Sequence, residues 1–179
     1  HIQRIEANPA IKLAIVAPDG REAMVLHAAQ LARQGLPFVF DPGQGLPMFN
    51  GAELLAFIEQ ATWVTVNDYE AEMLRERTGL SLPELAANVH GLVVTLGNEG
   101  CDVYENGSCS RVAPVQAVAA LDPTGCGDAF RGGLLYGLER GWSLARSAAL
   151  GNHMGAIKIA HFGPQNYHID ASALLAKVA

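Results

Sequence analysis

Asp122-Pro123-Thr124-Gly125-Cys126-Gly127-Asp128 is the stretch of sequence from which the fold can be argued. It places small residues where a backbone must approach a ligand closely, and the residues after it begin a helix. The first N–H groups of a helix have no partner within it and attract anions, although glycines at a helix entry can also serve only a tight turn. The sequence here contains neither a P-loop pattern nor the third glycine of a dinucleotide-binding turn. The stretch therefore indicates a phosphate site on another scaffold.

Asp128, the last residue of this stretch, adds a negative charge at the start of the predicted helix. A carboxylate is a poor neighbour for a phosphate in the ground state, because like charges repel. Its position beside an anion site indicates a base that takes a proton from an attacking hydroxyl group.

The pattern Asp-x-Thr-Gly-x-Gly-Asp resembles the signature of the ribokinase-like, or PfkB-type, family of sugar and nucleoside kinases. The resemblance implies that Asp128 is the catalytic base and that the amides of Gly125, Cys126 and Gly127 form an anion hole for the transferred phosphoryl group. It also implies an α/β fold, a three-layer sandwich whose mostly parallel central sheet carries helices on both faces. Arg131, one helical turn further on, is expected to reach the phosphoryl group or the nucleoside, unless it is an ordinary surface arginine.

A second motif, Asn67-Asp68-Tyr69-Glu70, follows a predicted strand and opens a predicted helix. An asparagine at the N-cap and a glutamate three residues later form a capping box, which needs no ligand. The motif also resembles the Asn-x-x-Glu element of the same family, which implies that Asn67 and Glu70 organise Mg²⁺ and phosphate through water. Because Mg²⁺ keeps several waters and takes one or two carboxylates, a single glutamate is sufficient.

The ATP side is expected along the apolar run that ends in Thr95-Leu96-Gly97-Asn98-Glu99-Gly100. The strand after it is expected to form a hairpin around Asn106-Gly107, a strong turn signal. The resemblance implies that Thr95, Gly97 and Gly100 lie along the nucleotide and that Asn152 borders its adenine.

A monovalent cation site, for K⁺, is expected from the resemblance at Asp122 and Thr124 together with the loop 160–163. Cys126 lies at a predicted helix N-terminus, which lowers the pKa of a thiol and makes it reactive.

Hydrophobic periodicity predicts alternating strands and helices, so the sheet should be mostly parallel. The predicted strands are 12–17, 37–40, 62–66 and 92–96, with edge strands at 101–105 and 108–112. The predicted helices are 19–34, 52–60, 68–77, 83–88, 128–139, 143–160 and 171–178. In open α/β sheets ligands bind beyond the carboxyl ends of the strands, where Asp41, Asn67, Gly97 and Asp122 are expected.

The composition predicts a folded protein with small-molecule ligands. Half of the residues are hydrophobic and the net charge is −6, which argues against nucleic acid or an anionic membrane as a partner. The three cysteines have no Cys-x-x-Cys spacing, which favours reduced thiols and a cytoplasmic location.

Residues 1–179 are expected to be the C-terminal portion of a single ribokinase-like kinase domain, without the N-terminal part and the lid. The resemblance also allows a homodimer formed through that missing lid. The sequence segments around 40–44, 67–79 and 122–131 are similar to those of bacterial adenosine kinases. This resemblance implies an enzyme that transfers the γ-phosphoryl group of ATP to a primary hydroxyl, most simply adenosine to AMP. The alternatives are a ribokinase- or fructokinase-type sugar kinase and a catalytically silent nucleotide-binding fragment.

Overall fold

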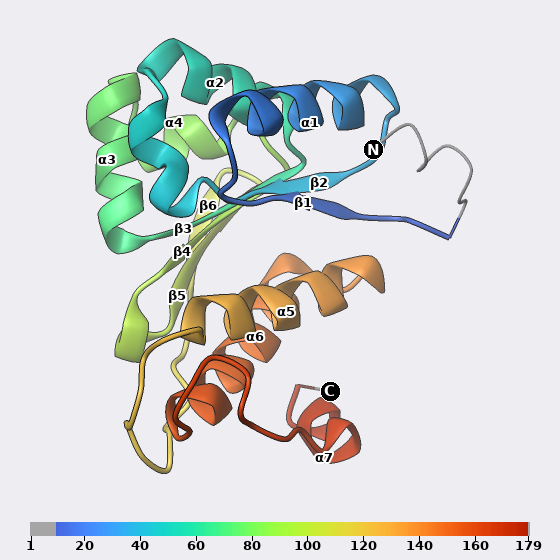
Figure 1. The fold of residues 1–179 in the computed structure, drawn as a ribbon, viewed down its shortest axis with the longest axis vertical. Coiled ribbons are helices and arrows are strands. Elements are labelled where there is room, and N and C mark those ends of the chain that lie inside the picture. The colour runs from blue at the N-terminus through green and yellow to red at the C-terminus, as the bar shows by residue number, and fades with distance from the viewer. Residues whose placement is uncertain (1–9, 179) are drawn as a thin grey trace. The chain divides into compact units, whose positions relative to one another are not determined.

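The computed structural model describes residues 10–178, which form two compact units. The first unit comprises residues 10–95 and 104–109, and the second comprises residues 96–103 and 110–178. Within residues 10–178, the strands form one six-stranded sheet in the order β1-β2-β3-β4-β5-β6 (Figure 1). The order in the sheet equals the order in the chain, so consecutive strands are neighbours throughout.

The first unit contains four parallel strands, β1 (Ala14–Val16), β2 (Phe38–Phe40), β3 (Trp63–Asn67) and β4 (Gly91–Thr95). Nearly all of their central residues are apolar and buried, as expected for a parallel sheet covered by helices. Phe40 stacks on Phe57 with ring centroids 4.5 Å apart, and Phe49 meets the same ring edge-on. These aromatic contacts fix the helical layer of this unit against β2.

The helices of the first unit are α1 (Arg21–Arg33), α2 (Gly51–Gln60), α3 (Asp68–Thr78) and α4 (Leu82–Ala86). A six-residue 3₁₀ helix, η2 (Gly43–Met48), lies between β2 and α2. Both α2 and α3 begin with an Asn-x-x-Glu capping box, and α3 ends at Gly79 in the left-handed conformation. These local signals place the start of α3 directly at the carboxyl end of β3.

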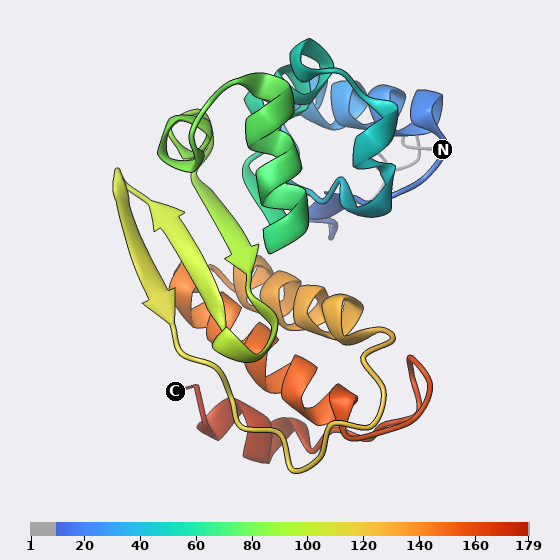
Figure 2. The same ribbon diagram turned by 90° about the vertical axis from the view of Figure 1, so that its left-hand side faces the viewer.

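A hairpin of β5 (Cys101–Glu105) and β6 (Ser108–Val112) follows β4 and the short 3₁₀ helix η3 (Gly97–Glu99), and it is seen as the yellow-green pair in Figure 2. Its two-residue turn has positive φ at both Asn106 (53°) and Gly107 (74°). This is the type I′ geometry whose twist matches paired strands, so the Asn-Gly signal in the sequence correctly predicts the turn.

The second unit contains α5 (Cys126–Glu139), α6 (Leu144–Ile159) and α7 (Ala171–Ala176). Helices α5 and α6 lie side by side in both ribbon views (Figures 1 and 2). They approach so closely that a Cβ on Gly133 would lie 2.8 Å from the backbone nitrogen of Gly151. Leu150 and Leu174 join α6 to α7 in a small apolar cluster.

The predicted fold class, α/β with a mostly parallel sheet, is confirmed. Each predicted strand and helix exists, and its ends differ from the prediction by no more than two residues. The helix η2 was not predicted, because its Gly- and Pro-rich sequence indicates only a loop. Within residues 10–178, no helix is both long enough and apolar enough to cross a membrane.

Candidate active site

The segment before α5 is folded by its own side chains and amides. The Oδ1 atom of Asp122 accepts the N–H of Thr124 at 2.9 Å, and the N–H of Cys126 donates to the carbonyl of Pro123 at 3.1 Å. The chain then enters α5 through Gly125, which is the N-cap and has φ of 82°. This pair of tight turns brings the segment directly into the first turn of the helix.

Gly125 is required for two separate reasons. Its φ lies in the left-handed region, where a side chain costs about 1–2 kcal/mol. A Cβ at this position would also lie 2.8 Å from the Cβ and 2.9 Å from the Cα of Pro164. The Pro164 loop is therefore in direct contact with the helix entry, and the sequence signal for glycine here has a physical cause.

Of the predicted anion hole of Gly125, Cys126 and Gly127, the amide of Cys126 has a hydrogen-bond partner within the protein. This amide is committed to the Pro123 carbonyl, so it is not available to a phosphate in this arrangement. The amides of Gly127 and Asp128 lie in the first turn, where an α-helix has no carbonyl to receive them. Donors for an anion are therefore expected from Gly127 and Asp128, one residue further along than the sequence suggested.

Asp128 and Arg131 both lie at this helix start. The carboxylate of Asp128 is exposed in the first turn of α5. The guanidinium of Arg131 folds back, so that its Nη1 atom lies 2.6 Å from where a Cβ on Gly127 would be. Arg131 is thus half-buried beside the first turn rather than extended into solvent, and a side chain at position 127 would displace its guanidinium.

Lys158 is a residue of this site that the sequence analysis missed. It lies in the last turn of α6 and is completely buried. Its Nζ donates to the carbonyl oxygens of Asp122, at 2.6 Å, and His161, at 3.1 Å. The sequence feature that could have indicated this role is the position of the lysine between Ile157 and Ile159. An isolated cation within an apolar helical segment needs hydrogen-bond acceptors if that face of the helix is buried.

Asp122 is held ionised by its surroundings. The N–H of Thr124, the N–H of Gly163 at 2.8 Å and the nearby Lys158 ammonium lower the pKa of Asp122 to about 2. The Nζ atom of Lys158 lies 3.9 Å from its Oδ2 atom. Asp122, Thr124 and the 160–163 loop are therefore brought together as predicted, but with a lysine among them.

The predicted reactive thiol at Cys126 is wrong. Burial raises the pKa of the Cys126 thiol above its ordinary value, and the nearby Lys158 offsets this only in part. The Sγ atom also lies 3.9 Å from the carbonyl oxygen of Asp122. In this position Cys126 acts as a small packing residue.

Asn67 and Glu70 form a complete capping box. The Oε2 atom of Glu70 accepts the N–H of Asn67 at 2.8 Å, and the Oδ1 atom of Asn67 accepts the N–H of Glu70 at 2.7 Å. Thr95 pairs in register with Asn67, and its hydroxyl lies 3.4 Å from the Val66 carbonyl oxygen. The three residues therefore lie at the carboxyl ends of β3 and β4, and for Asn67 this is the position that the sequence predicts.

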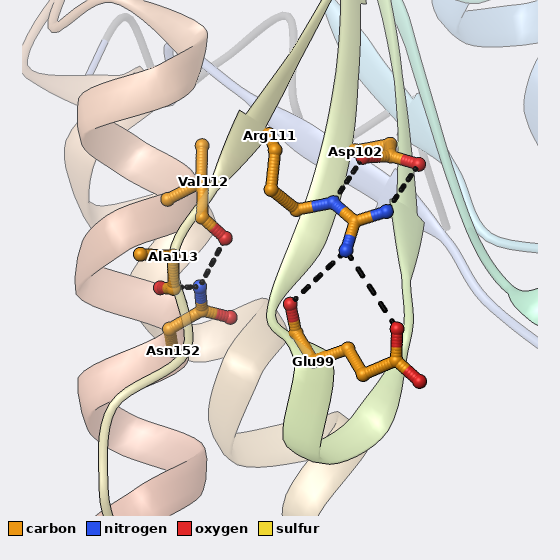
Figure 3. A network of polar contacts seen from close by, with 6 residues as sticks. All are labelled: Glu99, Asp102, Arg111, Val112, Ala113 and Asn152. Carbon is orange, nitrogen blue, oxygen red and sulfur yellow. Dashed lines mark hydrogen bonds and ion pairs between the residues drawn. The ribbon is translucent and has the colours of Figure 1, made fainter.

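Asn152 has a structural role that the sequence did not indicate, because its side chain binds the backbone of another segment. Its Nδ2 atom donates to the carbonyl of Ala113 at 2.9 Å and lies 3.4 Å from that of Val112, so that α6 holds the chain leaving β6 (Figure 3). Gly100 also lies against this backbone, and a Cβ there would be 2.2 Å from the Val112 oxygen. Gly97 is exposed and has φ of 58°. A contact of Gly97, Gly100 or Asn152 with a nucleotide stays a prediction.

An ion-pair network stiffens the base of the same hairpin. Arg111 on β6 forms a forked contact with Asp102 on β5, with the second nitrogen–oxygen distance at 3.2 Å. Its remaining nitrogen lies 3.8 Å from the carboxylate of Glu99 (Figure 3). The loop that contains Gly97 and Gly100 is therefore tied to both strands by an arginine.

The residues of this site are compatible with Mg²⁺ but not with K⁺, the two ions that the sequence analysis expects. In the described part of the chain, no group of three or more His, Cys, Asp and Glu side chains could ligate a metal directly. Mg²⁺ would thus depend mainly on phosphate oxygens and water, which fits its preference for retained waters, and a role of Glu70 through water stays a prediction. The expected K⁺ site does not fit, because the Lys158 ammonium lies among the oxygens that would have to bind the ion.

Comparison with known proteins gives consistent results. The family model described as pfkB family carbohydrate kinase matches residues 2–171. The nucleoside kinase of Methanocaldococcus jannaschii is 30% identical over 112 residues, which are 63% of this chain and 37% of that protein. The inositol 3-kinase of Arabidopsis thaliana is 40% identical over 78 residues, or 44% of this chain and 22% of that protein.

Among solved structures, the Burkholderia thailandensis nucleoside kinase in complex with inosine is 49% identical, with a TM-score of 0.90. The match covers 93% of this chain and 55% of that one, so the chain spans about half the length of this relative. The Methanocaldococcus jannaschii nucleoside kinase, at 23% identity and a TM-score of 0.85, shares the fold.

Proposed function

The chain belongs to the pfkB family of carbohydrate kinases, and we propose that its parent protein transfers the γ-phosphoryl group of ATP to a primary hydroxyl of a nucleoside. The observation that carries this proposal is the start of α5. There the exposed carboxylate of Asp128, the first-turn amides and the Arg131 guanidinium are gathered behind a glycine N-cap. This arrangement supports the proposal of a donor-rich anion site with a base beside it.

In the proposed reaction, the hydroxyl oxygen of the acceptor attacks the γ-phosphorus in line. Its proton passes to the carboxylate of Asp128, and the bond from the γ-phosphorus to the bridging oxygen breaks, releasing ADP. Negative charge on the transferred group would be stabilised by the amides of Gly127 and Asp128 and by the guanidinium of Arg131. Mg²⁺, organised through water by Asn67 and Glu70, would supply the remaining charge neutralisation on the phosphates. Thr95, Gly97, Gly100 and Asn152 are proposed to lie along the nucleotide.

A nucleoside is the favoured acceptor because the relative with 49% identity is a nucleoside kinase in complex with inosine. The sequence segments that resemble adenosine kinases favour adenosine as the acceptor, whereas this comparison favours inosine. A sugar or polyol acceptor is the second candidate, since inositol 3-kinases match at 40% identity or more over 72–78 residues. A cytoplasmic enzyme that acts in purine salvage would follow from the nucleoside alternative.

The test is an ADP-release assay on the full-length protein with adenosine, inosine, ribose, fructose, fructose 6-phosphate and myo-inositol in parallel. We expect kcat/KM to be highest for a nucleoside. Asp128→Asn should lower kcat by about 10²–10⁴-fold with ATP affinity retained, because a positioned base contributes this much. Glu22→Gln, at an exposed acid in the first turn of α1, is the control.

Each outcome of the assay separates the alternatives. Highest turnover on ribose, fructose or inositol would replace the nucleoside by a sugar or polyol acceptor. Full turnover in Asp128→Asn would remove Asp128 from the role of base. ATP binding with no turnover on any of the six acceptors would favour a silent nucleotide-binding protein.

A further inference from the structure

Lys158 is a completely buried cation whose side-chain nitrogen points at oxygen atoms. A lysine is rarely fully buried unless its ammonium group has partners. Here the Nζ atom donates to the carbonyl oxygens of Asp122 and His161, at 2.6 and 3.1 Å. The carboxylate oxygen Oδ2 of Asp122 lies 3.9 Å away. An ammonium on the end of α6 is thus surrounded by oxygens from two separate segments.

These oxygens are the type of ligands that a hard monovalent cation needs. Carbonyl and carboxylate oxygens bind such ions, and an ammonium ion is close in size and equal in charge to K⁺. They also come from the Asp122 segment and the 160–163 loop, where the sequence predicts a K⁺ site. The carboxylate itself is fixed by the N–H groups of Thr124 and Gly163, so the oxygen cage has little freedom to accept a second cation.

We propose that Lys158 is a built-in replacement for the monovalent cation, so that the protein binds no K⁺ at this site and needs none. The ammonium holds the Asp122 segment to the 160–163 loop, and the next residue of that loop, Pro164, packs on Gly125 at the entry to α5. The cation therefore fixes the geometry of the helix start that carries Asp128. Only the part of this inference that concerns turnover rests on the proposed kinase function.

The first test measures the thermal unfolding of the full-length protein in K⁺, Na⁺ and tetramethylammonium chloride at equal ionic strength. We expect the wild type to have the same melting temperature in all three salts, within about 1 °C. A melting temperature that rises and saturates specifically with K⁺ would overturn the proposal. This readout needs no substrate, so it remains decisive if the kinase function fails.

The second test removes the ammonium. Lys158→Ala leaves the partly exposed Asp122 carboxylate and two carbonyls around an empty space, and loss of the buried ammonium should lower the melting temperature by roughly 5–15 °C. We expect K⁺ or methylammonium to restore part of this loss, because either ion can enter the vacated cage. Lys158→Met fills the space without charge and should be destabilised without rescue. Lys177→Ala, at an exposed lysine after α7, should change neither quantity.

The turnover arm compares the same salts in the ADP-release assay. We expect wild-type kcat to be the same in K⁺ and tetramethylammonium, and Lys158→Ala to become K⁺-dependent. A wild type that turns over only in K⁺ would overturn the inference while upholding the proposed function. If the Ala variant does not fold, Lys158→Met together with the wild-type salt series decides the question. A Met variant as stable as the wild type would also contradict the proposal.

Discussion

The contact between α5 and α6 leads to a prediction in which two adjacent glycines respond oppositely to the same change. Gly132 and Gly133 follow one another within α5. A Cβ at Gly132 would have no atom within 4 Å, whereas a Cβ at Gly133 would lie 2.8 Å from the nitrogen and 2.9 Å from the Cα of Gly151. Carbon atoms pack at about 3.5–4.0 Å, so α6 would have to move away by roughly 0.7 Å or more.

The expected magnitudes follow from these distances. Alanine is favoured over glycine within a helix by about 0.5–1 kcal/mol, and both substitutions gain this amount. Gly132→Ala should therefore be stabilising by about that value. Gly133→Ala carries the same gain plus the cost of overpacking, typically about 1–3 kcal/mol. The difference between the two variants isolates the overpacking cost, so Gly133→Ala should be the less stable by about 1–3 kcal/mol.

Urea unfolding of both variants of the full-length protein, followed by circular dichroism, measures this difference. The slope of the free energy of unfolding against urea concentration should stay constant, so that the midpoints report stability alone. Equal stability of the two variants, or a more stable Gly133→Ala, would refute the close approach of α5 and α6.

Three further changes test the site. The pKa of Asp122 is lowered from 3.8 to about 2. The ionised carboxylate therefore stabilises the fold fully above pH 4, and this stabilisation is lost as the pH falls toward 2. The urea midpoints of wild type and Asp122→Asn should converge over that range. Gly125→Ala should destabilise the protein by at least about 1–2 kcal/mol in urea unfolding, because it combines a left-handed φ with contact against Pro164. Glu70→Gln should raise the Mg²⁺ concentration needed for half-maximal ADP release, whereas Glu53→Gln, in the matching capping box of α2, should leave it unchanged.

The parts of the fold that the sequence predicts well are those set by local chemistry. The hairpin turn follows from Asn106-Gly107 alone, and the start of α3 follows from Asn67 and Glu70. The carboxyl-end position of Asn67 follows from the strand before it, since β3 ends where α3 begins. Each of these depends on residues within about five positions of one another, so a single sequence contains the full signal.

The parts that the sequence did not predict depend on contacts over a long separation. The task of Asn152 requires the carbonyl of Ala113, 39 residues earlier. The task of Lys158 requires the carbonyl of Asp122, 36 residues earlier. The pKa of Cys126 was predicted in the wrong direction, because the helix start argues for a low value while burial, which is a tertiary property, raises it. No local pattern reports any of these distances.

Helix α6 therefore controls the site although it contains no signature motif. Its Gly151 permits α5 to approach, its Asn152 holds the chain that leaves β6, and its Lys158 holds the segment that enters α5. These three residues span two turns of one helix, so a shift of α6 would move the chain that leaves β6 and the Asp128 helix start together. Substitutions on α6 are consequently expected to change the catalytic rate and the stability in parallel, whereas a change at Asp128, which is exposed, should affect the rate alone.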